Sequence, residues 1–187
     1  PGMPCLYYGD ELGMGDWPGL RDRDPNRTPM AWTPARNGGF SSAPDPLLVL
    51  PPITAPGYDY RVVNVEVQKQ LPGSLLNWHR RMLTCRRLLP ALRHGDFELL
   101  PSAHPSVISY VRCDGRMTVL VAANLSAAGA SLQLDLSRWE GERTREVMWG
   151  CEYPAASADW FVYLPAHGFN WWLLGEVEEQ NDALQES

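Results

Sequence analysis

Two neighbouring carboxylates near the start of the sequence, Asp10 and Glu11, have side chains that could take part in catalysis. A retaining glycosidase uses one carboxyl group as nucleophile and another as acid and base, and the two face each other about 5–5.5 Å apart. Adjacent side chains on an extended segment point to opposite sides, which is the wrong geometry for such a pair. We therefore expect Asp10 and Glu11 to orient other site residues or to close the floor of a pocket. The alternative is a structural role in a salt bridge or a loop hydrogen bond.

Further along, Asp22, Asp24 and Asn26 show the spacing of the first ligands in a calcium-binding loop. A loop of the EF-hand type also needs Gly at its sixth position and Glu at its twelfth. This sequence has Arg27 and Thr33 at those positions, and the arginine adds positive charge where a cation would bind. We therefore predict a cluster of ion pairs here and no metal site.

Arginine and tryptophan side chains of the same region could contact a sugar. Arg23 and Arg27 carry planar guanidinium groups, which offer several donors to carboxylates and sugar hydroxyls. Trp17 and Trp32 lie in the same segment and are the best candidates for stacking on a sugar ring. Most of the other tryptophans are expected in the core, because large aromatic side chains dominate buried area.

These residues follow a short apolar and aromatic run at residues 3–8. Such a run is typical of a strand buried on both faces, and α/β enzymes place their sites beyond the carboxyl ends of such strands. Residues 16–72 are rich in Pro, Gly, Asp and Arg without a sustained period, so we expect a long catalytic-side loop folded onto a barrel mouth. A complete (β/α)8 barrel takes roughly 250 residues. The chain of 187 residues is therefore expected to be part of a larger enzyme.

A helix is predicted after Ser74, which can cap its first turn. Apolar residues recur at helical spacing as far as Leu89, and Pro90 is expected to end or closely follow the helix. Four arginines occupy much of the remaining surface, and we interpret them as a solvated face: Arg80, Arg81, Arg86 and Arg87.

From about Gly95 the pattern changes to short strands. The sequence Asp114-Gly115-Arg116 between two apolar runs predicts a hairpin. Strands are predicted at residues 107–113, 117–124, 130–136, 145–149, 160–164 and 168–174. Many short strands at regular spacing are typical of an antiparallel β-sandwich.

The patterns divide the chain into three parts. Residues 1–94 are predicted to be the end of a catalytic α/β part, with a strand, a long catalytic-side loop and a helix, and the family resemblance described below implies that these are the last strand and last helix of a barrel. Residues 95–175 are predicted to be a β-sandwich domain, and residues 176–187 a disordered acidic tail.

Composition narrows the classes of function. Hydrophobic residues make up 44% of the chain and eight residues are tryptophan, which predicts a folded core. The formal net charge is −6 without a basic stripe, so we expect no nucleic-acid partner. No apolar run approaches the roughly 20 residues of a membrane helix, so no membrane partner is expected. The cysteines form no C-x-x-C pair, which favours reduced thiols in a cytoplasmic enzyme over a zinc or redox site: Cys5, Cys85, Cys113 and Cys151.

The sequence resembles the α-amylase superfamily, glycoside hydrolase family 13, over nearly its whole length. The motifs that it shares with α-glucosidases are Tyr7-Tyr8-Gly9-Asp10-Glu11 and Arg27-Thr28-Pro29-Met30. Within the superfamily it is similar to the trehalose synthases, or maltose α-D-glucosyltransferases, at Leu50-Pro51-Pro52-Ile53 and Ser137-Arg138-Trp139-Glu140-Gly141.

The resemblance implies that the chain begins at the last strand of a (β/α)8 barrel and continues into the carboxy-terminal β-domain of such enzymes. In the family, the nucleophilic Asp, the acid/base Glu and a second Asp all precede that strand. The resemblance therefore implies no catalytic residue in this segment, which alone should be inactive. It implies no cofactor in the segment either, and a calcium ion of the parent enzyme would lie in the missing part.

The resemblance further implies a parent enzyme that interconverts two small disaccharides, maltose and trehalose, by double displacement and intramolecular transglucosylation. In the family, the loop with Arg23, Asp24 and Arg27 lies near the acceptor side of the pocket, so these residues are implied to shape the site. Two residues depart from the family pattern: Ala31 replaces Gln in Pro-Met-Gln-Trp, and Arg21 replaces Gly before Asp-Arg-Asp. There are two alternatives for the function of the chain. It could be part of a hydrolytic α-glucosidase or oligo-1,6-glucosidase, or it could be a stand-alone carbohydrate-binding module.

Overall fold

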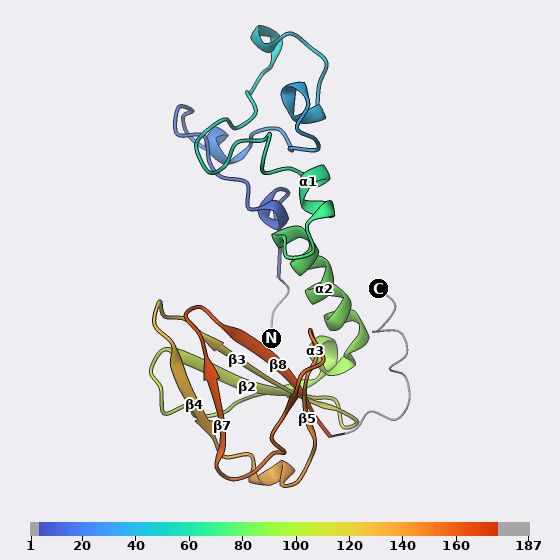
Figure 1. Cartoon of the computed structure of the whole chain (residues 1–187), viewed down its shortest axis with the longest axis vertical. Helices are drawn as coiled ribbons and strands as arrows, with labels where there is room; N and C mark the ends of the chain where they lie inside the picture. The colour runs from blue at the N-terminus through green and yellow to red at the C-terminus, as the bar shows by residue number, and fades with distance from the viewer. Residues whose placement is uncertain (1–3, 176–187) are drawn as a thin grey trace. The chain divides into compact units, whose positions relative to one another are not determined.

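The computed structural model describes residues 4–175, and the acidic tail predicted at residues 176–187 lies outside them. The described chain forms two compact units that divide between Arg81 and Met82 (Figure 1). The first unit consists mainly of turns and short helices, whereas the second is built from antiparallel strands.

The first unit folds around buried polar and apolar side chains. Its elements before residue 72 are the 3-10 helices η1 (Asp10–Leu12), η2 (Asp24–Asn26), η3 (Arg36–Gly39) and η4 (Asp45–Leu47), and the α-helix α1 (Val65–Gln70). Leu12, Ala31 and Ile53 are buried, and so are the polar residues Asn37 and Asn64. The long segment predicted as a loop is thus folded onto side chains of its own, and it contains α1, which the sequence analysis does not predict.

The strand predicted at residues 3–8 does not form among the described residues. Residues 4–8 have no regular structure, and Leu6, Tyr7 and Tyr8 expose 48%, 49% and 42% of their surface. A parallel strand needs hydrogen-bonded neighbours, and none of the described strands pairs with this segment. The structure differs from the prediction here because the pairing partners of such a strand are not among these residues.

The helix predicted after Ser74 is confirmed as α2 (Leu75–Leu88). Ser74 Oγ accepts a hydrogen bond from the backbone N–H of Asn77 at 3.2 Å, as expected of a capping residue. Pro90 starts a further short helix, α3 (Pro90–His94), since proline is tolerated in the first turn, where its missing N–H has no intrahelical partner.

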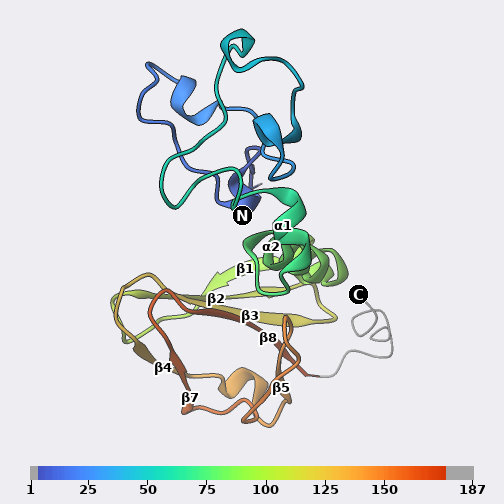
Figure 2. The same ribbon diagram turned by 45° about the horizontal axis from the view of Figure 1, so that its top comes forward.

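The second unit contains two antiparallel sheets (Figure 2). The larger sheet has the strand order β1-β2-β3-β8-β5-β6, and β4 pairs with β7 in the smaller one. The strands are β1 (Asp96–Leu99), β2 (Val107–Cys113), β3 (Thr118–Asn124), β4 (Ala130–Leu134), β5 (Thr144–Glu146), β6 (Glu152–Tyr153), β7 (Trp160–Leu164) and β8 (Phe169–Leu174). This arrangement confirms the predicted class, an all-β sandwich after the end of the α/β part.

Strand β3 is buried on both faces of the larger sheet. Because successive side chains of a strand alternate between faces, Leu120 packs into one cluster and Val119 and Val121 into another. The first cluster includes Leu132 of β4, and the second includes Leu92 of α3. The smaller sheet therefore covers one face of the larger sheet, and α3 covers part of the other.

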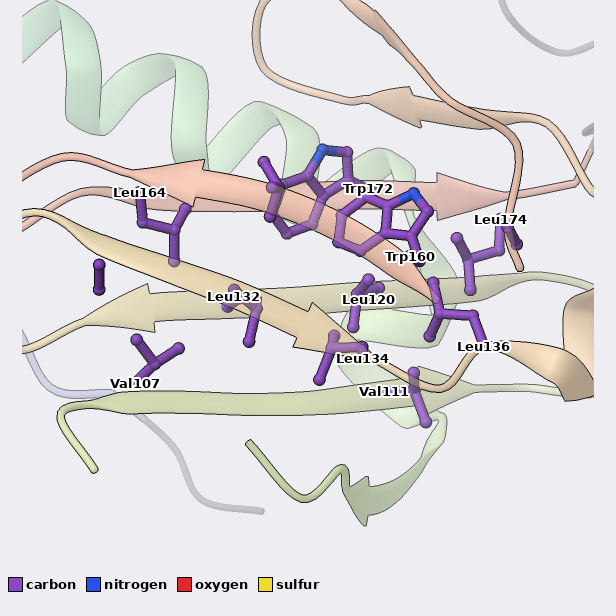
Figure 3. Packing of buried hydrophobic residues seen from close by; sticks show 14 residues of the cluster. Val107, Val111, Leu120, Leu132, Leu134, Leu136, Trp160, Leu164, Trp172 and Leu174 are labelled. Atoms are coloured by element: carbon purple, nitrogen blue, oxygen red, sulfur yellow. The ribbon is translucent and has the colours of Figure 1, made fainter. Parts of the chain in front are cut away.

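Two tryptophans lie at the centre of the sandwich (Figure 3). The rings of Trp160 on β7 and Trp172 on β8 have centroids 5.1 Å apart and meet edge to face. The ring of Tyr153 lies 5.5 Å from that of Trp172, also edge to face. Such aromatic pairs contribute about 0.5–1.5 kcal/mol beyond the burial of their area. Trp160 Nε1 donates to the carbonyl of Pro154 at 3.0 Å, so this buried polar atom has a partner.

The predicted hairpin at Asp114-Gly115-Arg116 is confirmed between β2 and β3. Gly115 has a φ of 84°, in the left-handed region that glycine adopts without strain. Asp114 Oδ1 accepts the backbone N–H of Met117 at 3.0 Å and that of Arg116 at 3.1 Å. These bonds, the one from Met117 above all, hold the pKa of Asp114 below its ordinary value.

Some strand bounds differ from the prediction. β2 and β7 match the predicted residues, whereas β1 and β6 are not predicted. The side chains of β1 are all exposed and β6 has two residues, so neither shows an alternating pattern. β5 ends at Glu146, because the carboxylate of Glu146 accepts the N–H groups of Met148 and Trp149 at 2.9 and 2.6 Å and the chain turns there.

The buried side-chain amide of Asn124 binds the loops that connect strands of the sandwich. Asn124 is 2% exposed, and its Nδ2 donates to the carbonyls of Ala128 and Pro165 at 2.7 and 2.9 Å. Its Oδ1 accepts the backbone N–H of Ser126 at 3.0 Å. Ala128 precedes β4 and Pro165 follows β7 of the smaller sheet, whereas Asn124 itself ends β3 of the larger one, so this side chain links strand ends of both sheets.

Replacing Asn124 by Leu should lower the free energy of unfolding by roughly 2–4 kcal/mol, because each buried backbone group that loses its partner costs about 1–3 kcal/mol. Urea unfolding followed by tryptophan fluorescence measures the change. The matched control is Thr144→Val, since Thr144 is fully buried and its Oγ1 has no hydrogen-bond partner within residues 4–175. That control should change the same free energy by less than about 1 kcal/mol. Equal losses in the two variants would contradict the role assigned to Asn124.

Candidate functional site

Asp10 and Glu11 lie in the turn η1, where each carboxylate binds backbone that precedes it in the chain. Asp10 Oδ2 accepts the N–H of Tyr7 at 2.9 Å, and Glu11 Oε2 accepts the N–H of Gly9 at 2.8 Å. The segment is a turn and not the extended chain that the sequence argument assumes. In the described chain both carboxylates therefore make loop hydrogen bonds, and each is directed to a different backbone amide.

A hollow of about 290 Å³ lies beside this turn. Its volume is close to the lower end of the range for small-molecule pockets, about 300–1,000 Å³. Its lining combines tyrosine rings with carboxylate, amide and hydroxyl groups: Tyr7, Tyr8, Gly9, Asp10, Met14, Gly15, Asp16, Asn26 and Thr28. Asp10 belongs to the candidates named from the sequence, whereas Asp16, Asn26 and the tyrosines carry no such prediction. Their position within the shared Tyr-Tyr-Gly-Asp-Glu motif could have drawn attention to the tyrosines.

Tyr8 connects two segments of the hollow. Its hydroxyl donates to the carbonyl of Thr28 at 2.9 Å, and its ring centroid lies 4.5 Å from that of Tyr7. Partial burial is the main factor that raises the pKa of Tyr8, the neighbouring Tyr7 adds to the rise, and the positive charge of Arg27 opposes it. Tyr8 therefore stays a neutral hydrogen-bond donor at neutral pH.

The charged segment around η2 is exposed. Arg23, Asp24 and Arg27 all lie at the surface, and none of the ion pairs found within residues 4–175 includes them. The predicted cluster of ion pairs is therefore not formed in the described chain, as expected where water screens such pairs to about 0–1 kcal/mol. In the sequence these three residues flank Asn26 and Thr28, which line the hollow.

The two candidate tryptophans differ in exposure, and neither is among the residues that line the hollow. Trp17 is half-buried, and its backbone N–H donates to the carbonyl of Pro25 at 3.0 Å, which ties the start of the segment to η2. Trp32 is 50% exposed, and its backbone carbonyl accepts the N–H of Glu66 at 3.0 Å at the start of α1. The Trp32 ring is thus accessible from solvent, and its backbone is bonded to the start of α1.

Within residues 4–175, no group of three or more His, Cys, Asp or Glu side chains is arranged to hold a metal ion. None of the helices in this range has the length and hydrophobicity needed to cross a lipid bilayer. None of the four cysteines forms a disulfide within residues 4–175. The lining of the hollow presents hydroxyl, carboxylate and amide groups and the rings of two tyrosines.

Two known families match consecutive parts of the chain. The α-amylase catalytic domain matches residues 1–95, slightly more than half of the 187 residues, and the C-terminal domain of maltogenic amylase matches residues 97–171. The chain belongs to the α-amylase family. The first match contains η1, the hollow and the charged segment, and the second contains nearly all of the sandwich.

Relatives within the α-amylase family extend well beyond this chain. The chain is 46% identical over 178 residues to the trehalose synthase/amylase TreS of Mycobacterium tuberculosis, a match of 93% of this chain and 30% of the relative. It is 46% identical over 183 residues to the trehalose synthase of a Pimelobacter species, covering 95% of this chain and 32% of that protein. The chain therefore spans about a third of the length of these relatives.

Solved structures of the α-amylase family show the same fold. The trehalose-6-phosphate hydrolase of Bacillus licheniformis superposes with a TM-score of 0.71 at 19% identity, over 94% of this chain and 36% of that protein. An isomaltulose synthase variant from Erwinia rhapontici, in complex with sucrose, gives 0.69 at 22% identity over 91% and 35%. The α-glucosyl transfer enzyme XgtA gives 0.68 at 30% identity, over 91% and 32%.

Proposed function

We propose that the complete enzyme to which this chain belongs interconverts maltose and trehalose by intramolecular transfer of a glucosyl group. The observation that carries the proposal is the 46% identity, over nearly the whole chain, to trehalose synthases from two genera. The chain is also 31% identical to a probable α-glucosidase of Rhizobium meliloti, over 89% of its length. The higher identity favours the isomerase over a hydrolase.

In this proposal the chain supplies a wall of the sugar pocket and not the reacting carboxylates. Retaining glucosyl transfer needs two carboxyl groups that face each other at about 5–5.5 Å. Asp10 and Glu11 are each bound to a different backbone N–H, which leaves them poorly arranged for that role. The nucleophile and the acid/base are assigned to the part of the catalytic domain outside this chain, so the chain alone has no activity.

The hollow beside η1 would accept part of the disaccharide. Tyr7 and Tyr8 present rings for the apolar face of a sugar, and Asp16 and Asn26 present groups that bind hydroxyls. The exposed groups of Arg23, Asp24 and Arg27 and the ring of Trp32 would help to keep the released glucose in place and water out. Exclusion of water decides whether the glucosyl intermediate is transferred to glucose or hydrolysed.

We also propose that the catalytic part ends at residue 94 and that the β-domain occupies residues 95–175. The change from one matched family to the other between residues 95 and 97 supports this boundary, as does the start of β1 at Asp96. No cofactor is assigned to the segment. A cytoplasmic location is proposed because none of the four cysteines forms a disulfide in the described residues, and disulfides persist mainly in oxidising compartments.

The proposal predicts that the complete enzyme, supplied with maltose, forms trehalose as its main product and free glucose as a minor one. The isolated chain of 187 residues should form neither above a buffer control. Chromatography of the sugars over time measures both. Glucose as the main product from the complete enzyme would favour the hydrolytic α-glucosidase, and trehalose made by the isolated chain would contradict the assignment of the catalytic carboxylates.

In the complete enzyme, Arg23→Ala should raise the ratio of glucose to trehalose several-fold, and Arg27→Ala should raise it less. The reason is that a guanidinium group at the pocket mouth would help to retain glucose during the transfer. Arg36→Ala is the matched control, because Arg36 is also exposed and its ion pair with Asp45 at 2.9 Å lies outside the hollow's lining. An unchanged ratio in both pocket variants would remove this segment from the mechanism.

A further inference from the structure

The side-chain amide of Gln68, at the end of α1, joins two segments that are far apart in the sequence. Gln68 Nε2 donates to the backbone carbonyl of Leu12 at 2.7 Å, across 56 residues. Its Oε1 accepts the backbone N–H of Leu76, in the first turn of α2, at 3.0 Å. A side-chain amide donates through its NH2 group and accepts through its oxygen, and here each of these two groups binds one backbone group.

Leu12 is the residue through which this contact reaches the candidate site. It is the last residue of η1, directly after Asp10 and Glu11, and it is 2% exposed. Its backbone N–H donates to the carbonyl of Gly9 at 3.0 Å, which closes the turn. Holding the carbonyl of Leu12 therefore holds the turn that carries both carboxylates and one side of the hollow.

The position of Gln68 is itself fixed from two directions. At the start of α1, the fully buried Asn64 accepts the N–H of Val67 at 2.9 Å and caps the helix. At its end, the backbone carbonyl of Gln68 accepts Ser74 Oγ at 2.7 Å and Asn77 Nδ2 at 3.0 Å. The side chain of Gln68 thus extends from a helix whose backbone is hydrogen-bonded at both ends.

We infer that Gln68 is a positioning residue of the active site: it sets the place of the Asp10–Leu12 turn, and with it the wall of the sugar pocket, through its hydrogen bond to Leu12. The inference deepens the proposed function and rests on it for its kinetic consequences. No sugar contact is assigned to Gln68, which is absent from the lining of the hollow.

The experiment uses the complete enzyme with three substitutions. Gln68→Met keeps the length of the side chain and removes both hydrogen bonds, and Gln68→Glu keeps an acceptor for Leu76 but cannot donate to Leu12 when ionised. Asn124→Leu is the matched control, because it also removes a buried amide, whose Nδ2 binds the carbonyls of Ala128 and Pro165, and these bonds involve neither Gln68 nor Leu12. For each variant, kcat, KM, the melting temperature and hydrogen exchange of the peptide covering residues 7–15 are measured.

Both Gln68 variants should lose at least tenfold in kcat with KM changed less than threefold, and their 7–15 peptide should exchange at least fivefold faster. Asn124→Leu should lower the melting temperature while leaving kcat and the exchange of that peptide within twofold of wild type. Wild-type kcat in Gln68→Glu, or equal loss of kcat in Asn124→Leu, would overturn the inference. The two proposals fail on different results. If the complete enzyme makes no trehalose from maltose, the proposed function is wrong. If the Gln68 variants leave the hydrogen exchange of the 7–15 peptide unchanged, the role of Gln68 is wrong, whatever sugar the enzyme makes.

Discussion

Backbone N–H and C=O groups that no helix or strand pairs must find partners elsewhere, and both units of this protein meet that requirement with a few amide and carboxylate side chains. Leaving such a group buried without a partner costs about 1–3 kcal/mol, which is large against the marginal stability of a domain. Asn37, Asn64 and Gln68 serve the irregular unit, and Asn124 and Glu146 serve the turns of the sandwich. Each of them binds backbone in a segment where the spacing of hydrophobic residues does not predict the structure.

The two units rely on these side chains to different degrees. In the sandwich, ladders between neighbouring strands satisfy most backbone groups, and the tryptophan cluster fills the space between the sheets. In the irregular unit, no strand is found between residues 9 and 81, so the turn with Asp10 and Glu11 depends on single contacts. One substitution at such a contact can therefore displace the turn with little change in the core.

Sequence reasoning predicts the sandwich well and the candidate site less well, for a physical reason. Alternation of buried and exposed residues is strong in β7 and is enough to find its ends, whereas exposed β1 carries no such signal. The helix after Ser74 is likewise found from its cap and its period. In the site, a chemical pattern identifies Asp10 and Glu11, but their partners are backbone amides, which leave no trace in the residue types. The bond from Gln68 to Leu12 spans 56 residues and could not be predicted for the same reason.

We propose that this chain forms part of the wall of a sugar pocket whose reacting carboxylates lie elsewhere in the complete enzyme. The most direct test is a crystal structure of the complete enzyme with glucose or trehalose bound. The account predicts sugar oxygens within hydrogen-bond distance of residues that line the hollow or of Arg23, with Asp10 still bound to the N–H of Tyr7. A sugar bound far from all of these residues, or Asp10 placed in line with the anomeric carbon as a nucleophile, would contradict it.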